Sequence, residues 1–151
     1  MLIGVPGSGK STWIRNHRHD AVVLSTDDYI DRAASAAGLT YSQAFADHIK
    51  PATADMQAQY KQAIKDRRDI IWDQTNLTKK SRRGKLSGLP KAYEKIALYF
   101  PTPDAEELSK RLDSRPGKVI PADVLRRMTA DLEPPEADEG FDEIYMVPSG
   151  S

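Results

Sequence analysis

The amino-acid sequence predicts an α/β fold in three layers, with a central parallel sheet of four to five strands between helices. Short apolar runs rich in β-branched residues alternate with segments of helical character, which is typical of parallel sheets covered on both faces. A glycine-rich segment separates the first apolar run from the first helix. The 151 residues show neither an internal repeat nor a linker, so residues 1–151 are predicted to form one domain.

Five apolar runs are the predicted strands, and each is short enough to be a buried strand. They cover residues 2–5, 21–24, 70–73, 96–100 and 144–147. Ligands of open α/β sheets bind beyond the carboxyl ends of the strands. We therefore expect functional residues directly after Val5, Leu24, Trp72 and Phe100.

Helices are predicted at residues 10–17, about 40–68, about 79–85, 104–115 and 121–132. Pro51 predicts a kink or a break in the second of these, because proline lacks the amide hydrogen that a helix uses. Asp104 is a typical N-cap residue, and Pro116-Gly117 ends the helix that it begins. The last helix has an apolar face at Val124, Leu125, Met128 and Leu132.

The composition is that of a soluble globular protein, with 39% hydrophobic and 29% charged residues. The absence of cysteine excludes disulfides, thiolate metal sites and cysteine nucleophiles, and it fits a cytoplasmic location. No apolar run approaches the roughly 18 residues that span a bilayer, so no membrane partner is expected. Residues 1–100 carry 16 basic and 10 acidic side chains, whereas residues 101–151 carry 6 and 12. A nucleic-acid partner would therefore meet a local basic face.

Residues 4–11 match the P-loop pattern in full, and they lie between a strand and a helix as the motif requires. Glycines let backbone N–H groups curl around phosphate oxygens, and the helix directs the positive end of its dipole at the same anion. Lys10 is expected to reach the β- and γ-phosphates of ATP, and Ser11 to bind Mg²⁺. The motif predicts a P-loop NTPase or kinase fold. The predicted nucleotide ligands of the loop are Pro6, Gly7, Ser8, Gly9, Lys10, Ser11 and Thr12.

Polar residues follow the second and third predicted strands. Asp27 and Asp28 stand where a carboxylate can take a proton from an acceptor hydroxyl, although either can instead cap a following helix. Asp73 is similar to the strand-end aspartate that assists Mg²⁺ in many P-loop enzymes. Thr75 and Asn76 either hold an acceptor phosphate or hold their own loop.

Two charged stretches have alternative interpretations. Residues 61–95 hold 11 basic and 4 acidic side chains, with the densest basic run at residues 79–85. This run is either a footprint for a phosphate backbone or a solvated helix face. The acidic stretch at residues 131–143 either borders an adenine pocket near Gly140-Phe141 or solvates the surface.

Arg111 and Arg115 lie four residues apart, on one face of a predicted helix. The turn at Pro116-Gly117 makes residues 111–121 a candidate lid. A lid arginine neutralises charge on a transferring phosphoryl group, and a closed lid excludes the water that would hydrolyse ATP. Ordinary surface ion pairs are the alternative role for these arginines.

Taken together, these motifs resemble those of the polynucleotide 5′-hydroxyl kinase family, specifically the kinase half of the phage-type polynucleotide kinase-phosphatases. The carriers of the resemblance are Gly4 to Trp13, Asp27-Asp28-Tyr29, Thr75-Asn76-Leu77, Arg111 with Arg115, and Val119 to Arg126. The resemblance implies transfer of the γ-phosphoryl group of ATP to a 5′-hydroxyl end of DNA or RNA, with Mg²⁺ as cofactor. It implies Asp27 as general base and Lys10 as a phosphate ligand. It also implies that Arg115, with Arg111, stabilises the transferring phosphate or holds the nucleotide.

The sequence departs from that family at three points. The family often has an arginine three or four residues after its catalytic aspartate, where this chain has Ile30 and Asp31, so Arg32 is the candidate for the acceptor phosphate. Gln74 separates Asp73 from the Thr-Asn pair. The phosphatase nucleophile motif does not occur, which predicts a stand-alone kinase. The predicted acceptor-binding residues are Asp27, Arg32, Asp73, Thr75 and Asn76.

Two other functions stay open at this point. A small-metabolite or nucleoside kinase of the same fold would use the same P-loop and lid, and the basic run at residues 79–85 is the feature against it. A non-catalytic nucleotide-binding module would leave Asp27 and the lid arginines without a role.

Overall fold

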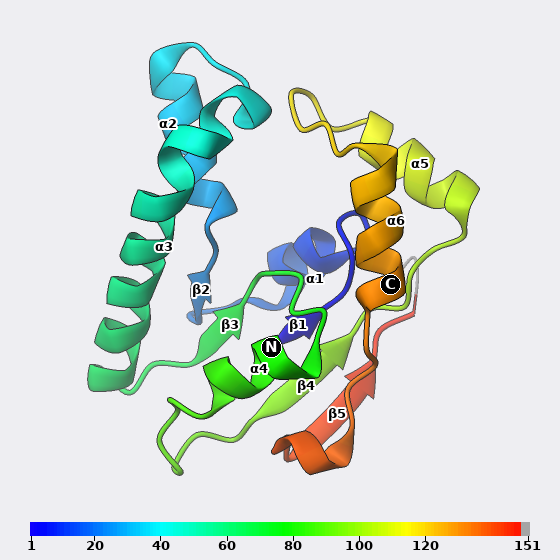
Figure 1. Ribbon diagram of the computed structural model, residues 1–151. Coiled ribbons are helices and arrows are strands. Elements are labelled where there is room, and N and C mark those ends of the chain that lie inside the picture. The colour runs from blue at the N-terminus through cyan, green and yellow to red at the C-terminus, as the bar shows by residue number, and fades with distance from the viewer. Residues whose placement is uncertain (149–151) are drawn as a thin grey trace.

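Strands and helices alternate along the chain in the computed structural model, which describes residues 1–148 (Figure 1). This alternation confirms the predicted α/β fold. The strands are β1 (Leu2–Ile3), β2 (Val22–Leu24), β3 (Ile70–Trp72), β4 (Ile96–Tyr99) and β5 (Glu143–Met146). The helices are α1 (Lys10–His17), α2 (Asp27–Ala37), α3 (Tyr41–Lys65), α4 (Lys79–Leu86), α5 (Ala105–Asp113), α6 (Ala122–Asp131) and the short 3-10 helix η1 (Ala137–Glu139).

All paired strands are parallel, but they form two hydrogen-bonded groups instead of the single sheet of four to five strands that was predicted. One group has the order β1-β4-β5 and the other consists of β2 and β3. The amide of Gly4 donates to the carbonyl oxygen of Thr75 at 3.0 Å, which ties the end of β1 to the segment after β3. Across the molecule the strands therefore run β2, β3, β1, β4, β5, as Figure 1 shows.

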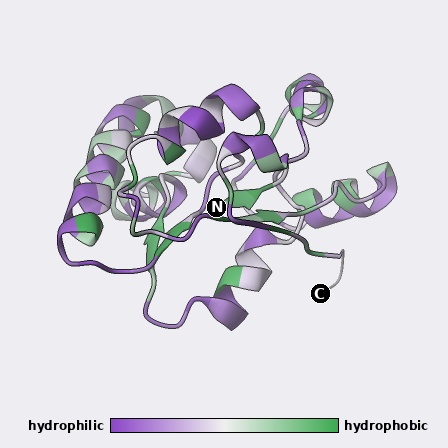
Figure 2. Ribbon diagram, turned by 90° about the horizontal axis from the view of Figure 1, so that it is seen from below, coloured by the Kyte–Doolittle hydropathy of each residue, from purple (hydrophilic) through white to green (hydrophobic). Residues whose placement is uncertain are grey.

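Helices cover both faces of the strands, because successive strand residues point to opposite sides. On one side Leu2 packs with Ile14 of α1 and with Phe100. On the other side Ile3 packs with Leu86 of α4. The side chains of Leu24, Met56 and Trp72 form a further cluster between β2, β3 and α3. This arrangement confirms the three layers, and Figure 2 shows hydrophobic strands between helices that carry many hydrophilic residues.

The sequence did not predict helix α2. It predicted α3 with a kink or a break at Pro51, and the structure shows no break there. Gly38 ends α2 in the left-handed conformation, with φ 69°. Thr40 then starts α3 through a capping box with Gln43. The backbone N–H of Gln43 donates to Thr40 Oγ1 at 3.2 Å. Helix α3 is 25 residues long and continues through Pro51. Small residues let α2 and α3 pack closely side by side, through Ile30, Ala34, Ala44 and Ala52.

The predicted lid residues end α5 and continue as a loop toward α6. This loop rests on α2 and α3: the amide of Ser42 donates to Gly117 O at 3.1 Å, and the amide of Val119 donates to Ser42 Oγ at 3.1 Å. Lys118 forms an ion pair with Asp31 of α2 at 3.0 Å. Within residues 1–148, no helix has both the length and the apolar character needed to cross a bilayer.

Candidate functional site

A cavity of about 1120 Å³ lies at the carboxyl ends of the strands, between the P-loop, the starts of α2 and α3, and the lid loop. It brings together most of the site residues that were predicted from the sequence. Those lining it are Pro6, Gly7, Gly9, Lys10, Ser11, Thr12, Asp27, Asp73, Thr75, Arg111 and Arg115. Segments more than 100 residues apart in the sequence therefore share one cavity, as expected for the carboxyl edge of a parallel sheet.

The P-loop path depends on glycine at two positions. A Cβ atom at Gly4 would lie 2.5 Å from Ser8 Oγ and 3.0 Å from the Cβ of Phe100. Gly7 has φ 84°, and a Cβ atom there would lie 2.9 Å from Leu108 Cδ1 of α5. Side chains at these two positions would clash with Ser8, Phe100 and α5, so the path of the loop requires glycine.

Lys10 lies folded over the P-loop, with Nζ donating to the carbonyl oxygens of Gly4 at 2.8 Å and Val5 at 3.0 Å. Burial is the main reason that its pKa falls from 10.5 to about 8. The carboxylates of Asp73 and Asp27 oppose this fall, and Arg115 adds to it. At neutral pH the ammonium group is still largely charged, so it suits a phosphate ligand.

Two carboxylates face Lys10 in the cavity. Asp27 is the first residue of α2, and its Oδ1 accepts a hydrogen bond from the Tyr41 hydroxyl at 2.5 Å. Asp73 follows β3, and burial raises its pKa from 3.8 to about 6. The charge of Lys10 opposes this rise, while Asp27 supports it. The cavity thus holds proton acceptors opposite a cationic P-loop.

The lid supplies two arginines to the same cavity. Arg111 Nε donates to Glu107 Oε1 at 2.8 Å, and Arg111 Nη1 donates to the carbonyl oxygen of Gly7 at 3.1 Å. Arg111 therefore ties α5 to the P-loop. Arg115 lines the cavity one helical turn further on. Its charge adds to the fall in the pKa of Lys10 and opposes the rise in the pKa of Tyr41. Together with Lys10, these arginines make the cavity attractive to a polyphosphate.

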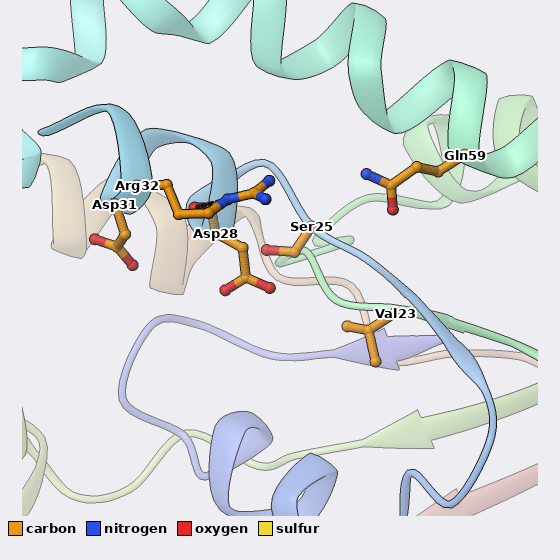
Figure 3. Close-up of a pocket in the computed structure, with 6 residues that line it drawn as sticks. All are labelled: Val23, Ser25, Asp28, Asp31, Arg32 and Gln59. Atoms are coloured by element: carbon orange, nitrogen blue, oxygen red, sulfur yellow. Dashed lines mark hydrogen bonds between the residues drawn. The ribbon is translucent and has the colours of Figure 1, made fainter. Parts of the chain in front are cut away.

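A second cavity of about 490 Å³ adjoins the first, because both are lined by Ser25, Asp28 and Asp31. Arg32 lies in this smaller cavity and not in the large one. Figure 3 shows Arg32 beside Asp28 and Ser25, with Gln59 reaching toward them from α3. The smaller cavity is therefore a polar extension on the α2 side of the site.

The sequence of the chain matches the model of a known protein family. The model of a family described as an AAA domain matches residues 1–135, which include the P-loop, both carboxylates, α5 and α6. The chain belongs to this family. The family is P-loop and kinase-like, so membership agrees with the phosphate-binding geometry of the cavity. Membership therefore indicates that this AAA domain binds a nucleotide and has a kinase-like function.

Three predicted site residues do not line the large cavity: Arg32, which lines the smaller one, and the buried Ser8 and Asn76. Ser8 is buried at 3% exposure, and its Oγ has no hydrogen-bond partner among the described residues. Asn76 is buried at 2% exposure, and its Nδ2 donates to Leu2 O at 2.7 Å and to Gln74 O at 3.2 Å. The Nζ of Lys85 donates to Asn76 Oδ1. Asn76 therefore holds its loop, which is one of the two roles that its sequence position allowed.

The basic run on α4 is partly paired within the chain, whereas Lys80 and Arg83 are exposed, so the phosphate footprint stays a prediction. Lys79 pairs with Glu136 at 2.8 Å, and the fully buried Arg82 pairs with Glu139 at 2.7 Å. The acidic stretch therefore packs against α4 and pairs with two of its basic side chains. Its Phe141 lies in the core beside Ile3 and is not among the residues that line the large cavity.

Sequence reasoning missed several residues of the site. Tyr41 and Ser25 line the large cavity, and Lys118 reaches it from the lid loop. An apolar wall on α3, the lid loop and α6 was also missed, and it is formed by Phe45, Ile49, Val119, Ile120, Val124 and Met128. Tyr41 had one usable signal: it directly follows Thr40, a typical N-cap, and so begins a helix near the carboxyl edge.

Proposed function

We propose that this AAA domain is a kinase that transfers the γ-phosphoryl group of ATP to the 5′-hydroxyl end of DNA or RNA. The observation that carries the proposal is that Lys10, Asp27 and Arg115 line one cavity. A cationic phosphate cradle, a proton acceptor and a lid arginine are the three parts that phosphoryl transfer needs. The motifs that resemble polynucleotide 5′-hydroxyl kinases supply the choice of acceptor.

The residues fit a nucleoside triphosphate with Mg²⁺. The cradle at Gly4 and Gly7 has no room for a Cβ atom, and Lys10 and Ser11 line the cavity beside it. Among residues 1–148, no group of three His, Asp or Glu side chains is placed to hold a metal ion. Ser11 would therefore hold Mg²⁺ together with the phosphates, as is usual for this ion. When bound, Mg²⁺ neutralises charge on the β- and γ-phosphate oxygens.

In the proposed reaction the acceptor hydroxyl oxygen forms a bond to the γ-phosphorus. The bond from that phosphorus to the β–γ bridging oxygen breaks, and ADP leaves. The proton of the hydroxyl goes to the carboxylate of Asp27. Lys10 and Arg115 neutralise the charge that develops on the transferring group.

The acceptor enters in this proposal through the smaller cavity beside Asp27. Arg32 lines that cavity and is an exposed residue, and in this proposal it binds a phosphate of the acceptor strand. Ser25 and Gln59 supply neutral hydrogen-bonding groups there. This is the role that the resemblance implies for an arginine near the catalytic aspartate.

A second candidate, a small-metabolite or nucleoside kinase, is favoured by one observation. Lys79 and Arg82 are paired with carboxylates, and Asp28 and Asp31 line the smaller cavity. Carboxylates suit the hydroxyl groups of a sugar, whereas they repel a long phosphate backbone.

An acceptor screen separates these candidates. Purified protein is incubated with γ-labelled ATP and Mg²⁺, together with 5′-hydroxyl single-stranded DNA, RNA, nicked duplex, nucleosides or sugars. The proposal predicts label on an oligonucleotide 5′ end, and no label with Lys10→Met. Consumption of ATP that only a nucleoside or sugar stimulates would establish the second candidate. Nucleotide binding without any phosphorylated acceptor would indicate a non-catalytic module.

A further inference from the structure

Tyr41 and Asp27 begin two neighbouring helices and meet at the cavity. Asp27 is the first residue of α2 and Tyr41 is the first residue of α3. The Tyr41 hydroxyl donates to Asp27 Oδ1 at 2.5 Å, which is a short hydrogen bond to a charged acceptor. The two helices lie side by side in Figure 1 and pack through small residues, so the separation of their first residues is fixed.

The ring of Tyr41 is also the surface on which the lid loop rests. Lys118 Nζ lies 4.9 Å from the ring centroid, a cation–π distance, and it pairs with Asp31 at 3.0 Å. Beside the ring, two groups of Ser42 donate to the carbonyl oxygen of Gly117: the backbone N–H at 3.1 Å and the side-chain Oγ at 3.0 Å. One tyrosine thus contacts both the carboxylate and the lid.

We propose that Tyr41 is a positioning residue that holds the Asp27 carboxylate through its hydroxyl and seats the closed lid through its ring. The inference deepens the proposed function and rests on it, because it assumes that Asp27 takes the proton of the acceptor. The Tyr41 hydroxyl donates to Oδ1 of Asp27, so that in this proposal Oδ2 accepts the proton of the acceptor hydroxyl. Lid closure and orientation of the base are coupled through one side chain.

The charged groups around Tyr41 suit a hydroxyl that stays a donor. Burial, then the hydrogen bond and charge of Asp27, and then the charge of Asp31 raise the pKa of Tyr41 above its usual range. Arg115 acts in the opposite direction from the lid, and Lys118 lies over the ring. The hydroxyl therefore stays protonated at neutral pH and continues to donate to the carboxylate.

The first test removes the hydroxyl and keeps the ring, in Tyr41→Phe. The control is Tyr145→Phe, because Tyr145 also donates to a carboxylate, Glu143 Oε2 at 2.7 Å, on the remote strand β5. Misorientation of the base should lower kcat about 10- to 100-fold, with KM for ATP within about twofold of the wild type. Tyr145→Phe should match the wild type in both constants.

The second test examines the lid, with trypsin as the probe. Arg115 precedes Pro116, which blocks tryptic cleavage, so Lys118-Val119 is the cleavable bond of the loop. Tyr41→Ala removes the seat of Lys118 and should speed cleavage at this bond several-fold. Tyr41→Phe keeps the ring and should cleave at the wild-type rate, although its kcat is low.

The outcomes separate this inference from the proposed function. If the wild type transfers phosphate and Tyr41→Phe has an unchanged kcat, the inference is overturned and the kinase assignment stands. If Tyr41→Ala is cleaved at the wild-type rate, the lid contact is overturned. If the wild type phosphorylates no acceptor, the proposed function fails and the role assigned to the hydroxyl fails with it, while the trypsin result still decides the role of the ring.

Discussion

Arg82 of α4 and Glu139 of η1 form a two-pronged ion pair in the interior, with Nε–Oε1 at 2.7 Å and Nη2–Oε2 at 3.0 Å. Arg82 is 0% exposed. Its Nη1 also donates to the carbonyl oxygens of Asn76 at 2.9 Å and Leu77 at 3.1 Å. One side chain therefore joins α4, the loop after β3 and the C-terminal acidic stretch.

The pair predicts a large loss of stability when one partner is removed. Arg82→Met leaves the Glu139 carboxylate without its buried counter-charge, which costs about 3–5 kcal/mol for such pairs. Urea unfolding measures the loss. The exposed neighbour Arg83 is the control, and Arg83→Met should change the free energy of unfolding by less than about 0.5 kcal/mol. Equal stability of the two variants would contradict the structural role of Arg82.

The same pair predicts loss of stability in acid. Burial alone would raise the pKa of Glu139, but hydrogen bonds from Arg82 and from the Glu136 backbone, with the charges of Arg82 and Lys79, lower it overall. A carboxyl whose pKa is lower in the folded state stabilises the fold above its unfolded pKa of 4.5, and this contribution is lost as pH falls through the folded pKa. Glu139→Gln should therefore unfold with a flatter pH dependence below about pH 4.5 than the wild type.

Asp73 predicts the opposite trend. Its pKa is raised from 3.8 to about 6, mainly by burial, so the folded state binds more protons between these values and stability falls as pH rises through them. Asp73→Asn should be more stable than the wild type above pH 6, by roughly 3 kcal/mol, and equal to it below pH 3.8. Thermal unfolding across this pH range measures the difference. A variant that is less stable at pH 8 would contradict the assignment.

Lys10 predicts how nucleotide affinity varies with pH. Only the ammonium form attracts phosphate, and burial lowers the pKa of this group in the free protein to about 8. Affinity for a non-hydrolysable ATP analogue should therefore fall as pH rises through 8, by up to about tenfold per pH unit. Lys10→Arg stays charged throughout and is the control. Calorimetric titrations that give a constant Kd up to pH 9.5 would argue against contact between Lys10 and the phosphates.

Much of the fold follows from local sequence patterns. The five apolar runs became strands, and the predicted helices were found with their ends shifted by a few residues. The helix α2 escaped prediction because its buried positions, Ile30 and Ala34, are few and one is small. Pro51 does not break α3, since packing of Ala44 and Ala52 against α2 outweighs the missing hydrogen bond.

In the site too, the contiguous motif was predicted from the sequence, whereas pairings between distant residues were not. The P-loop is a contiguous motif, and its conformation follows from glycines at fixed positions. The pairings of Arg82 with Glu139 and of Lys118 with Asp31 join residues 57 and 87 positions apart, so no local pattern reveals them. The sequence therefore did not reveal that Lys79 and Arg82 of the basic run pair with carboxylates of the same chain.

The most direct test of the account compares Asp27→Asn with Asp47→Asn, an exposed aspartate on α3. Both variants and the wild type are assayed for transfer to a 5′-hydroxyl oligonucleotide and for binding of ATP. Asp27→Asn should lose transfer by about 100-fold or more and keep its affinity for ATP, whereas Asp47→Asn should match the wild type. Transfer by Asp27→Asn at a rate near that of the wild type would contradict the assignment of Asp27 as the base.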